Sequence, residues 1–529
     1  MVIRGARIWG STESAIGIRG DRIVPAEIGP NTRVIEASGA TVVPGFQDAH
    51  VHTPFAGLNM LRVWLHDAVD RREYLQIITE HVRSHPGSDW ITGGGWAMSA
   101  FPGGNPHKAD LDAIVPDRPV FLLNRDVHGA WVNSRALEIA GITEITPDPP
   151  DGRIERDPAT GEPTGMLHEG AAYSMNERVV PAPSREQWRA AILEGQRHLH
   201  SLGVTAWQDA WVTPATQLAY RDLAREGRLT ARVVGALWWD RHRGLEQIDE
   251  LLEATTESAD GFHPTTVKIM IDGVLENYTG ALLEPYCDGC GGHTSNHGMT
   301  FVEPDLLDAA VTALDGHGLQ VHMHAIGDRA VRMGLDAVQA AGTANGPADN
   351  RHHIAHIQVV HPDDISRFGR LGVVANCQMY WASSDPQMQE LTIPFLGAER
   401  SEQQYPFASL QRSGARLAAG SDWSVSTANP LAQIEVGATR IDPADRDDAS
   451  PFLPTEAIDV HAGIEAFTSG SAYVNHDADG GSLALGKRAD LVLLGADITA
   501  GALMSGRGLA DVPIDMTIAS GRLVHSRLE

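Results

Sequence analysis

The middle of the chain alternates between the hydrophobic pattern of a helix and that of a strand. The segment 184–202 begins with Ser184, has Gln187 three positions later, and then repeats apolar residues at helical spacing until Gly203. This predicts a helix with a capping box, and the apolar run at 204–210 predicts the strand that follows. The rhythm recurs, with helices predicted at 303–318 and 361–372 and strands predicted at 319–326 and 373–380. Such an alternation predicts a parallel sheet, either doubly wound or closed into a barrel.

Both ends of the chain have a different pattern, in which short runs of alternating apolar residues are broken by glycine. Strands of this kind are predicted within residues 1–43 and again within 478–529. We therefore expect the two ends to join in one small β domain and residues 44–477 to form the α/β unit. Residues from about 60 to 180 fit the strand–helix alternation poorly and contain turn clusters rich in glycine and proline. We interpret them as an insertion that covers the site.

The composition limits the classes of function. Of the 529 residues, 42% are hydrophobic and 21% are charged, which is typical of a globular protein. The net charge of −27 repels nucleic-acid phosphates and anionic lipids, so neither is an expected partner. The sequence contains no apolar run long enough for a membrane helix, no secretory signal pattern and only three cysteines, which favours the cytoplasm. The absence of an early G-x-G-x-x-G motif argues against a dinucleotide-binding fold.

Histidines provide the most informative chemistry, because several of them follow predicted strands. His50 and His52 end the run at 46–52, where strand alternation turns both imidazoles to the same face. Two imidazoles side by side can bind one metal ion. The alternative is that both are polar residues leaving a strand for solvent.

Further candidates stand at the ends of later apolar runs. In the pair His322 and His324 the outer residue, His324, is the expected ligand, and His356 and Asp422 each end a later apolar stretch. The histidines at 352–353 are expected to be structural or on the surface. Since the carboxyl ends of parallel barrel strands open on one face, residues far apart in sequence can converge there. The histidines and the aspartate therefore predict a metal site at that face.

Lys268 lies inside an apolar predicted strand, where a buried, unpaired ammonium group is costly. One explanation is a surface position or a side chain that extends to solvent. The other is chemical, because a lysine carboxylated by carbon dioxide becomes an anionic oxygen ligand that can bridge two metal ions.

A second pattern of metal-binding residue types occurs in one loop. Cys287, Cys290, His293 and His297 have a shorter spacing than the usual zinc finger, and the segment is rich in glycine, asparagine and serine. This favours a mobile active-site loop over a structural zinc site.

Seven motifs occur in a fixed order between residues 44 and 494. They are PGFQDAHVH at 44–52, NRDVHGAWVNSRAL at 124–137, VKIMIDGVLENYTGALLEPY at 267–286, VHMHAIGDRAV at 321–331, RHHIAHIQVVHPDDISRFGRLGV at 351–373, AAGSDWSV at 418–425 and GSLALGKRADLVLL at 481–494. Together they resemble the amidohydrolase superfamily, in its amidohydrolase-3 (YtcJ-like) family, which includes N-substituted formamide deformylase. The set is specific for the superfamily and says little about the substrate.

The resemblance implies an α/β fold, a distorted (β/α)8 TIM barrel with a composite β-sandwich formed by both chain ends. By motif position, it implies metal ligation by His50, His52, Lys268, His324, His356 and Asp422. The family usually has a glutamate before the sixth-strand histidine, whereas this chain has Ala355. One contact around that histidine is therefore expected to differ from the family pattern.

The resemblance further implies a metal-dependent hydrolase that cleaves a non-peptide carbon–nitrogen bond in a small-molecule amide or N-substituted formamide. One or two Zn²⁺ ions, or another divalent metal, would activate water, Asp422 would transfer its proton to the leaving nitrogen, and His128 would help to bind the carbonyl. An apolar pocket wall is expected from the aromatic residues Trp96, Trp131, Tyr380, Trp381 and Trp423.

Two alternative functions stay open. One is a deaminase or a cyclic amide or ester hydrolase that uses the same metal site. The other is a non-catalytic metal-binding scaffold, which is expected to have lost a ligand or Asp422, and neither is lost here. The sequence leaves the physiological substrate and the oligomeric state open, with a homodimer among the alternatives.

Overall fold

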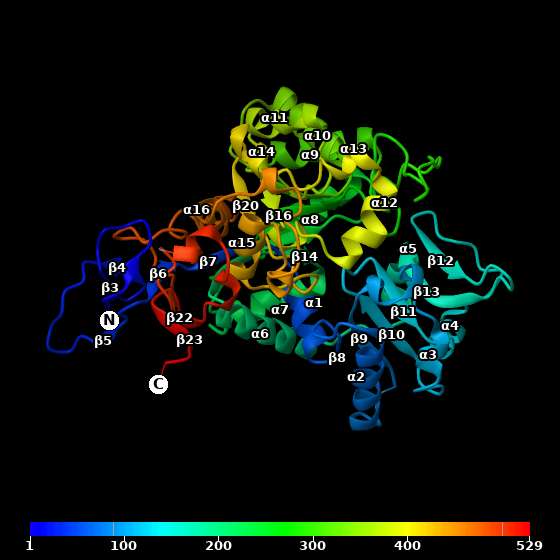
Figure 1. Ribbon diagram of the computed structural model, residues 1–529, viewed down its shortest axis with the longest axis horizontal. Coiled ribbons are helices and arrows are strands. Elements are labelled where there is room, and N and C mark those ends of the chain that lie inside the picture. The colour runs from blue at the N-terminus through cyan, green and yellow to red at the C-terminus, as the bar shows by residue number, and fades with distance from the viewer. Residues whose placement is uncertain (88, 500, 529) are drawn as a thin grey trace.

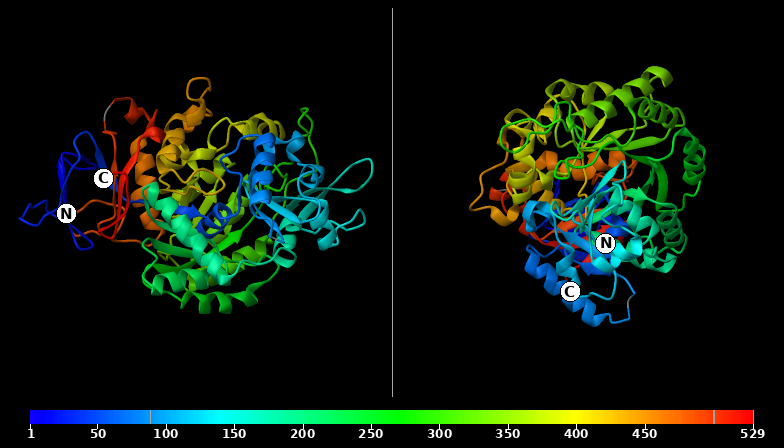
Figure 2. Two further views of the ribbon diagram at one scale, coloured as in Figure 1. Left: turned by 90° about the horizontal axis from the view of Figure 1, so that it is seen from below. Right: turned by 90° about the vertical axis from the view of Figure 1, so that its right-hand side faces the viewer.

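The computed structural model describes residues 1–87, 89–499 and 501–528. Within these residues the strands form sheets of eight, six, five and four strands. Figures 1 and 2 show the two chain ends together at one end of the molecule and the six-stranded sheet at the other. The eight-stranded sheet and its helices lie between them.

The eight-stranded sheet is a nearly closed parallel barrel. In order around the barrel its strands are β7 (Phe46–Val51), β14 (Val204–Val212), β15 (Arg232–Trp238), β16 (Phe262–Met270), β17 (Gln320–Ala325), β18 (His353–His356), β19 (Val374–Cys377) and β20 (Leu417–Ala419). The first and last strands meet where the Asp422 N–H donates a hydrogen bond of 2.8 Å to the His50 carbonyl. Gly420 allows this approach, because a Cβ there would lie 2.5 Å from the His50 Cβ. The predicted α/β class and the barrel are confirmed.

Helices alternate with the barrel strands and pack on their outer face (Figure 2). The predicted helix at 184–202 is α6 (Arg185–Ser201), and its capping box is present: the Gln187 N–H donates to Ser184 Oγ, and the Ser184 N–H donates to Gln187 Oε1. The helices predicted at 303–318 and 361–372 are also confirmed. The other helices of this layer are α1 (Thr53–Met60), α7 (Pro214–Arg225), α8 (Ile248–Thr255), α9 (Pro304–Gly316), α10 (Asp328–Asn345), α11 (Pro362–Leu371), α14 (Phe407–Arg412), α15 (Pro430–Thr439), α16 (Val460–Glu465) and α17 (Ser471–Val474). The short helices α12 (Ile393–Leu396) and α13 (Ala398–Ser401) belong to the segment between β19 and β20.

The two chain ends form one β-sandwich. Its four-stranded sheet consists of β1 (Val2–Arg4), β3 (Ala15–Arg19), β4 (Arg22–Val24) and β5 (Val34–Glu36), and its five-stranded sheet of β2 (Arg7–Ile8), β6 (Thr41–Pro44), β21 (Leu491–Leu494), β22 (Ile514–Ala519) and β23 (Arg522–Ser526). Antiparallel pairing of β6 with β21 joins the ends, and apolar side chains of both sheets share one core. The composite sandwich is confirmed, while the exact domain boundaries stay a prediction.

The six-stranded sheet belongs to the segment predicted as an insertion. Its strands are β8 (Val63–Trp64), β9 (Ile91–Trp96), β10 (Val120–Asn124), β11 (Gly129–Val132), β12 (Gly152–Arg156) and β13 (Pro163–Glu169), and its helices are α2 (Arg71–Ser84), α3 (Lys108–Asp112), α4 (Ser134–Ala140) and α5 (Gly170–Arg178). It has hydrophobic cores of its own, separate from that of the barrel. The segment is thus a folded layer beside the barrel mouth.

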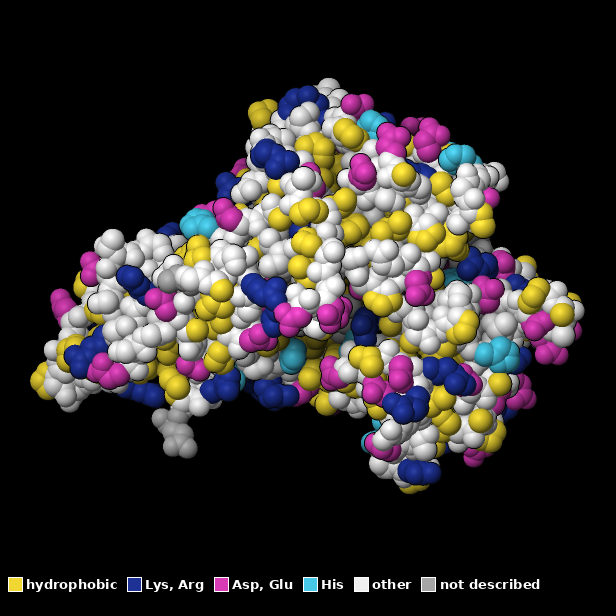
Figure 3. Space-filling model, viewed as in Figure 1, with side chains coloured by type: hydrophobic (Ala, Val, Ile, Leu, Met, Phe, Trp, Pro, Cys, Tyr) yellow, Lys and Arg dark blue, Asp and Glu magenta, His cyan; other side chains and the backbone are white. Residues whose placement is uncertain are grey.

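The outer surface agrees with the composition. On the face in Figure 3, acidic and basic side chains are interspersed among apolar and uncharged ones. Among the described residues, no helix is both long enough and apolar enough to cross a membrane.

Candidate active site

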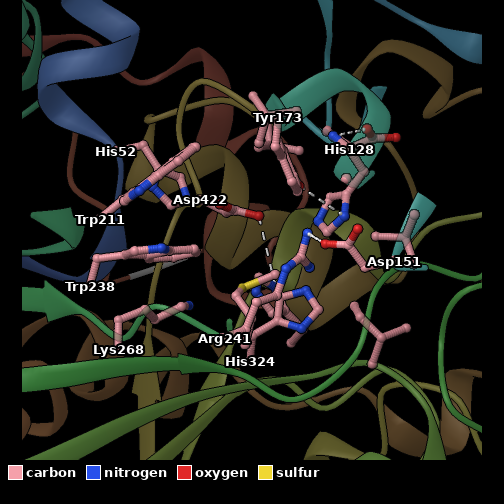
Figure 4. Close-up of a pocket in the computed structure, with 18 of the residues that line it drawn as sticks. His52, His128, Asp151, Tyr173, Trp211, Trp238, Arg241, Lys268, His324 and Asp422 are labelled. Atoms are coloured by element: carbon pink, nitrogen blue, oxygen red, sulfur yellow. Dashed lines mark hydrogen bonds and ion pairs between the residues drawn. The ribbon is translucent and has the colours of Figure 1, made fainter. Parts of the chain in front are cut away.

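A cavity of about 380 Å³ lies at the carboxyl ends of the barrel strands, between the barrel and the insertion. Its wall includes all the ligands implied by the resemblance together with His128, namely His50, His52, His128, Lys268, His324, His356 and Asp422. Figure 4 shows His52, Trp211, Trp238 and Lys268 on one side, with Asp422 pointing toward the space that separates them from His128 and Arg241. The structure therefore brings these residues to one cavity, and their roles as ligands stay predictions.

Three of these side chains are close enough to share one ion. His52 Nε2 lies 3.1 Å from Asp422 Oδ1, and His50 Nε2 lies 3.4 Å from the same oxygen. The two imidazole nitrogens are 3.3 Å apart. Throughout the described part of the chain, this is the one group of three or more His, Cys, Asp or Glu ligand atoms that all lie within 4.8 Å of one another.

The chemistry of this group fits a divalent metal. Asp422 is 4% exposed, and its Oδ1 atom has no hydrogen-bond partner among the described residues. A buried carboxylate oxygen without a partner is costly. Two imidazole nitrogens and a carboxylate oxygen are a donor set that Zn²⁺ prefers. An ion at this point would supply the partner that Asp422 Oδ1 lacks.

Local backbone contacts hold the three ligands in place. Asp48 Oδ1 accepts hydrogen bonds of 3.0 Å from the backbone N–H groups of both His50 and Ser421, so one carboxylate ties β7 to the segment after β20. Asp422 has φ of 54°, in the left-handed region that non-glycine residues rarely occupy. Such strain persists only where surrounding structure imposes it, and it clusters at functional sites.

The other implied ligands line the cavity but lie outside this group. His356 Nδ1 is 3.8 Å from Asp422 Oδ2, whereas His324 Nδ1 bonds to Asp272 Oδ1 at 3.2 Å. Lys268 Nζ lies 3.5 Å from His322 Nε2, and burial lowers the pKa of Lys268 to about 7. The lysine is therefore partly uncharged at neutral pH, the form that reacts with carbon dioxide.

A chain of contacts that the sequence did not predict links His50 to buried side chains outside the cavity. His322 Nε2 lies 2.8 Å from His50 Nδ1, and His322 Nδ1 lies 2.7 Å from Gln208 Oε1. His353 Nε2 lies 2.9 Å from the same amide oxygen. The available signal was the two-residue period of His322 and His324, which puts both on the inner face of β17. His352 bonds to Asp315 Oδ1 at 2.9 Å, so both histidines at 352–353 are structural.

His128 is paired with a carboxylate that sequence analysis did not identify. Its Nδ1 atom lies 2.9 Å from Glu169 Oε2, and Thr279 Oγ1 donates to Glu169 Oε1 at 2.7 Å. Burial alone would lower the pKa of His128, but the charge of Glu169 and its hydrogen bond outweigh burial and raise that pKa to about 9. The ring is therefore positively charged at neutral pH and can donate a hydrogen bond into the cavity.

Aromatic side chains form one wall of the cavity. Trp211 and Trp238 lie with ring centroids 5.0 Å apart, and Tyr173 faces Trp211 at 6.4 Å. Trp381 also lines the cavity, as expected. Trp211 and Trp238 were not predicted, although they stand at the ends of β14 and β15, where a barrel places residues at its mouth.

Two of the expected wall residues lie elsewhere, and that part of the prediction is wrong. Trp96 and Trp131 are each 0% exposed and pack in a core of the insertion. Their indole N–H groups donate to the Leu122 and His107 carbonyls. They are buried because the six-stranded sheet needs apolar side chains on its own inner face.

Tyr380 and Trp423 line a neighbouring cavity of about 330 Å³ instead of the one that holds the metal ligands. Among the described residues, the loop with Cys287 and Cys290 contributes no group of three or more His, Cys, Asp or Glu ligand atoms within 4.8 Å of one another. The zinc alternative for this loop is not supported.

Comparisons with known proteins agree with the geometry. The amidohydrolase family matches residues 33–525. The protein LONG AFTER FAR-RED 3 of Arabidopsis thaliana is 33% identical over 88% of this chain and 80% of its own length, and YtcJ of Bacillus subtilis is 30% identical over 94% and 91%. The N-substituted formamide deformylase of Arthrobacter pascens is 27% identical over 88% of this chain and 86% of its own length.

A solved structure has the same fold. An uncharacterized metal-dependent hydrolase from Pyrococcus furiosus is 26% identical and aligns with a TM-score of 0.70 over 94% of this chain and 99% of its own. At the mouth of the barrel, His50, His52 and Asp422 form a group that could hold a divalent metal ion. The chain belongs to the amidohydrolase family and is an amidohydrolase enzyme.

Proposed function

We propose that this enzyme is a Zn²⁺-dependent hydrolase that cleaves the carbon–nitrogen bond of an N-substituted amide or formamide. The observation that supports it most directly is the convergence of His50 Nε2, His52 Nε2 and Asp422 Oδ1, which accepts no hydrogen bond from the described residues, in one buried cavity. The similarity to N-substituted formamide deformylase adds support for the type of bond.

A divalent ion held by His50, His52 and Asp422 would act as a Lewis acid and activate water at neutral pH. Asp422 is in position to accept the proton of the attacking water and to return it to the leaving nitrogen. This second transfer matters because an unprotonated amide nitrogen is a poor leaving group. His128, kept charged by Glu169, donates a hydrogen bond to the carbonyl oxygen as it gains negative charge.

The aromatic wall indicates where an apolar part of the substrate binds. Trp211 stacks on Phe55 with ring centroids 4.4 Å apart, so its orientation is fixed from behind. Flat, rigid rings provide a large apolar contact at little cost in side-chain entropy. The wall formed by Trp211 and Trp238 therefore suits an apolar substituent next to the scissile amide.

The first prediction tests Asp422. With metal-replete enzyme and a panel of N-substituted formamides and amides, we expect Asp422→Asn to keep the fold and lower kcat by about 10²-fold to 10⁴-fold, since the amide side chain accepts no proton. Circular dichroism checks the fold, and the exposed Asp448→Asn serves as the control. Near-wild-type turnover by Asp422→Asn would remove this residue from the mechanism.

The same substrate panel tests the deaminase alternative. Ammonia release from ring amines by the wild type, without amide cleavage, would favour a deaminase.

The second prediction concerns the number of ions. A carboxylated Lys268 would add an oxygen ligand and favour two ions, whereas an unmodified lysine would favour one. We expect an intact-protein mass that includes one carbon dioxide and a metal content near two ions per chain, both reduced in Lys268→Met. An unmodified mass together with one ion per chain would favour the mononuclear site of His50, His52 and Asp422.

A further inference from the structure

A second cavity, of about 330 Å³, adjoins the active-site cavity, and we call it the side chamber. Asp126, Trp381 and Val425 line both spaces, so they form the boundary between them. The volume falls within the range of small-molecule sites. Nothing in the proposed chemistry uses this space.

Four carboxylates line the side chamber, those of Asp67, Asp126, Glu276 and Asp385. None of them forms an ion pair within the described ranges. Asp126 and Glu276 are 6% and 8% exposed. Buried carboxylates are normally paired with a cation, so this surplus of unpaired carboxyl groups is unusual.

The partners of these carboxylates are uncharged donors. Asp126 Oδ1 accepts from the His128 N–H at 3.0 Å, Glu276 Oε1 accepts from Thr392 Oγ1 at 2.7 Å, and Asp385 Oδ1 accepts from the Met388 N–H at 2.7 Å. Burial raises the pKa of Glu276 to about 7, with a further contribution from the charge of Asp126.

One cation, Arg125, also lines the side chamber. Its guanidinium donates to the backbone carbonyls of His66 and Ala68, at 3.0 and 3.4 Å. Carboxyl groups outnumber this single guanidinium. Burial raises the pKa of Asp126, Glu276 and Asp385, and a bound cation would favour their ionised form.

Aromatic side chains also contribute to the wall of the side chamber. Trp64, Tyr380, Trp381, Tyr405 and Trp423 line the side chamber. Stacking on His198, at 4.6 Å between ring centroids, fixes the Trp423 ring. Aromatic faces attract cations, and they attract large, weakly hydrated organic cations in particular.

The spacing of the carboxylates fits an organic cation better than a metal ion. A metal ion needs several ligand atoms within a few ångströms of one another, and within the described residues no such group of three or more His, Cys, Asp or Glu occurs in the side chamber. We infer that the side chamber is a binding site for an organic ammonium group, a protonated or quaternary amine, which the carboxylates neutralise at a distance and the aromatic rings enclose.

The position of the side chamber beside the active-site cavity indicates a class of substrate. This inference about the substrate rests on the proposed function. Trp381 and Val425 border both the side chamber and the active-site cavity, so a substrate that occupies both spaces would extend past these two residues. The substrate would then be an amide in which a short linker joins the scissile bond to an ammonium group. Its preferred form carries a positive charge, in agreement with the net charge of −27 on the enzyme.

Binding can be tested without catalysis. We expect calorimetric titration of the holoenzyme with choline to show saturable binding, and its uncharged isostere, in which a quaternary carbon replaces the nitrogen, to bind at least about tenfold more weakly. Glu276→Gln and Asp385→Asn should weaken choline binding by about tenfold or more. Glu253→Gln, which removes an exposed carboxylate on α8 outside both cavities, should not. Equal binding of choline and its isostere, or binding that both side-chamber variants retain, would overturn the inference.

The preference of the enzyme for charged substrates provides a second, independent test of the ammonium site. For matched amides with a trimethylammonium or a tert-butyl end group, kcat/KM should favour the charged substrate, and Glu276→Gln should abolish that preference while still cleaving the uncharged one. Cleavage of the uncharged substrate shows that the variant is folded. If no amide is cleaved but choline binds as described, the proposed function fails and the ammonium site stands. If amides are cleaved without any preference for charge, the ammonium site fails and the proposed function stands.

Discussion

The buried histidines of the barrel have different roles, and the partner of each ring decides which role it has. His50 directs Nε2 toward Asp422, and its other nitrogen lies against His322. His322 and His353 share the amide oxygen of Gln208, which is 0% exposed. A buried imidazole that is held at one nitrogen presents the other in a fixed direction. Gln208 therefore orients the ligand His50 through His322, without reaching the cavity itself.

The third prediction is at this scale. Gln208→Leu leaves two buried imidazoles without a hydrogen-bond acceptor. Each unpaired imidazole should lower the free energy of unfolding by about 1–3 kcal/mol. Because His50 then loses its fixed orientation, the metal affinity should fall by about 10–100-fold. Thermal unfolding and competition against a metal chelator measure these two effects. The exposed Gln339→Leu on α10 is the matched control. Unchanged metal affinity in a folded Gln208→Leu would show that His322 does not need this acceptor.

At the scale of elements, the positions of the predicted ligands His50 and His52 depend on how closely two helices approach. Helix α1 begins directly after His52, so its position sets where the end of β7 points. Gly57 of α1 faces the backbone of α6 so closely that a Cβ there would clash with the Ala191 carbonyl. Gly195 of α6 faces Thr53 in the same way, with a Cβ at 2.7 Å from Thr53 Cγ2. The packing of α1 on α6 is therefore part of the ligand geometry.

The fourth prediction compares two glycines in helices. Gly57→Ala forces α1 away from α6 and should cost about 1–3 kcal/mol while also weakening metal binding, because His52 moves with the helix. Gly342→Ala on α10, where an added Cβ meets nothing within 4 Å, should be neutral or stabilising by about 0.5–1 kcal/mol. Thermal unfolding with and without metal distinguishes the two. Equal stability of both variants would show that α1 can shift without consequence.

At the scale of the whole molecule, the composite sandwich is continuous with the barrel. The Gly45 N–H, between β6 and β7, donates to the Asp490 carbonyl at 2.9 Å, and Thr517 Oγ1 donates to the carbonyl of His200 in α6 at 2.7 Å. Gln47 of β7 donates to Asp477, which Arg488 also binds. The C-terminal strands thus anchor the strand that carries His50.

The fifth prediction follows from this anchoring. A chain that ends at Asp477 loses β21, β22 and β23, exposes the apolar face of β6, and is expected to be insoluble or to lose metal binding. Removal of residues 527–529, beyond β23, should leave both solubility and metal binding unchanged. Soluble expression and metal content are the measurements. A soluble, metal-binding chain that ends at Asp477 would show that the barrel folds independently of the sandwich.

Periodicity and strand-end positions in the sequence predicted a parallel strand–helix alternation, a small β domain from the two chain ends and polar residues at strand ends, and the family resemblance added the barrel and the ligand set. These are local properties, because a strand of a parallel barrel always delivers its carboxyl end to the same face. Tertiary structure alone decided which aromatic rings reach the cavity. Trp96 and Trp211 both lie in apolar strands, yet one packs inside the insertion and the other lines the cavity.

The same holds for the side chamber and for the hydrogen bond from Thr279 to Glu169, the partner of His128. Both join residues from the insertion and the barrel. No spacing in the sequence encodes such contacts, because they depend on how two separately folded layers pack against each other.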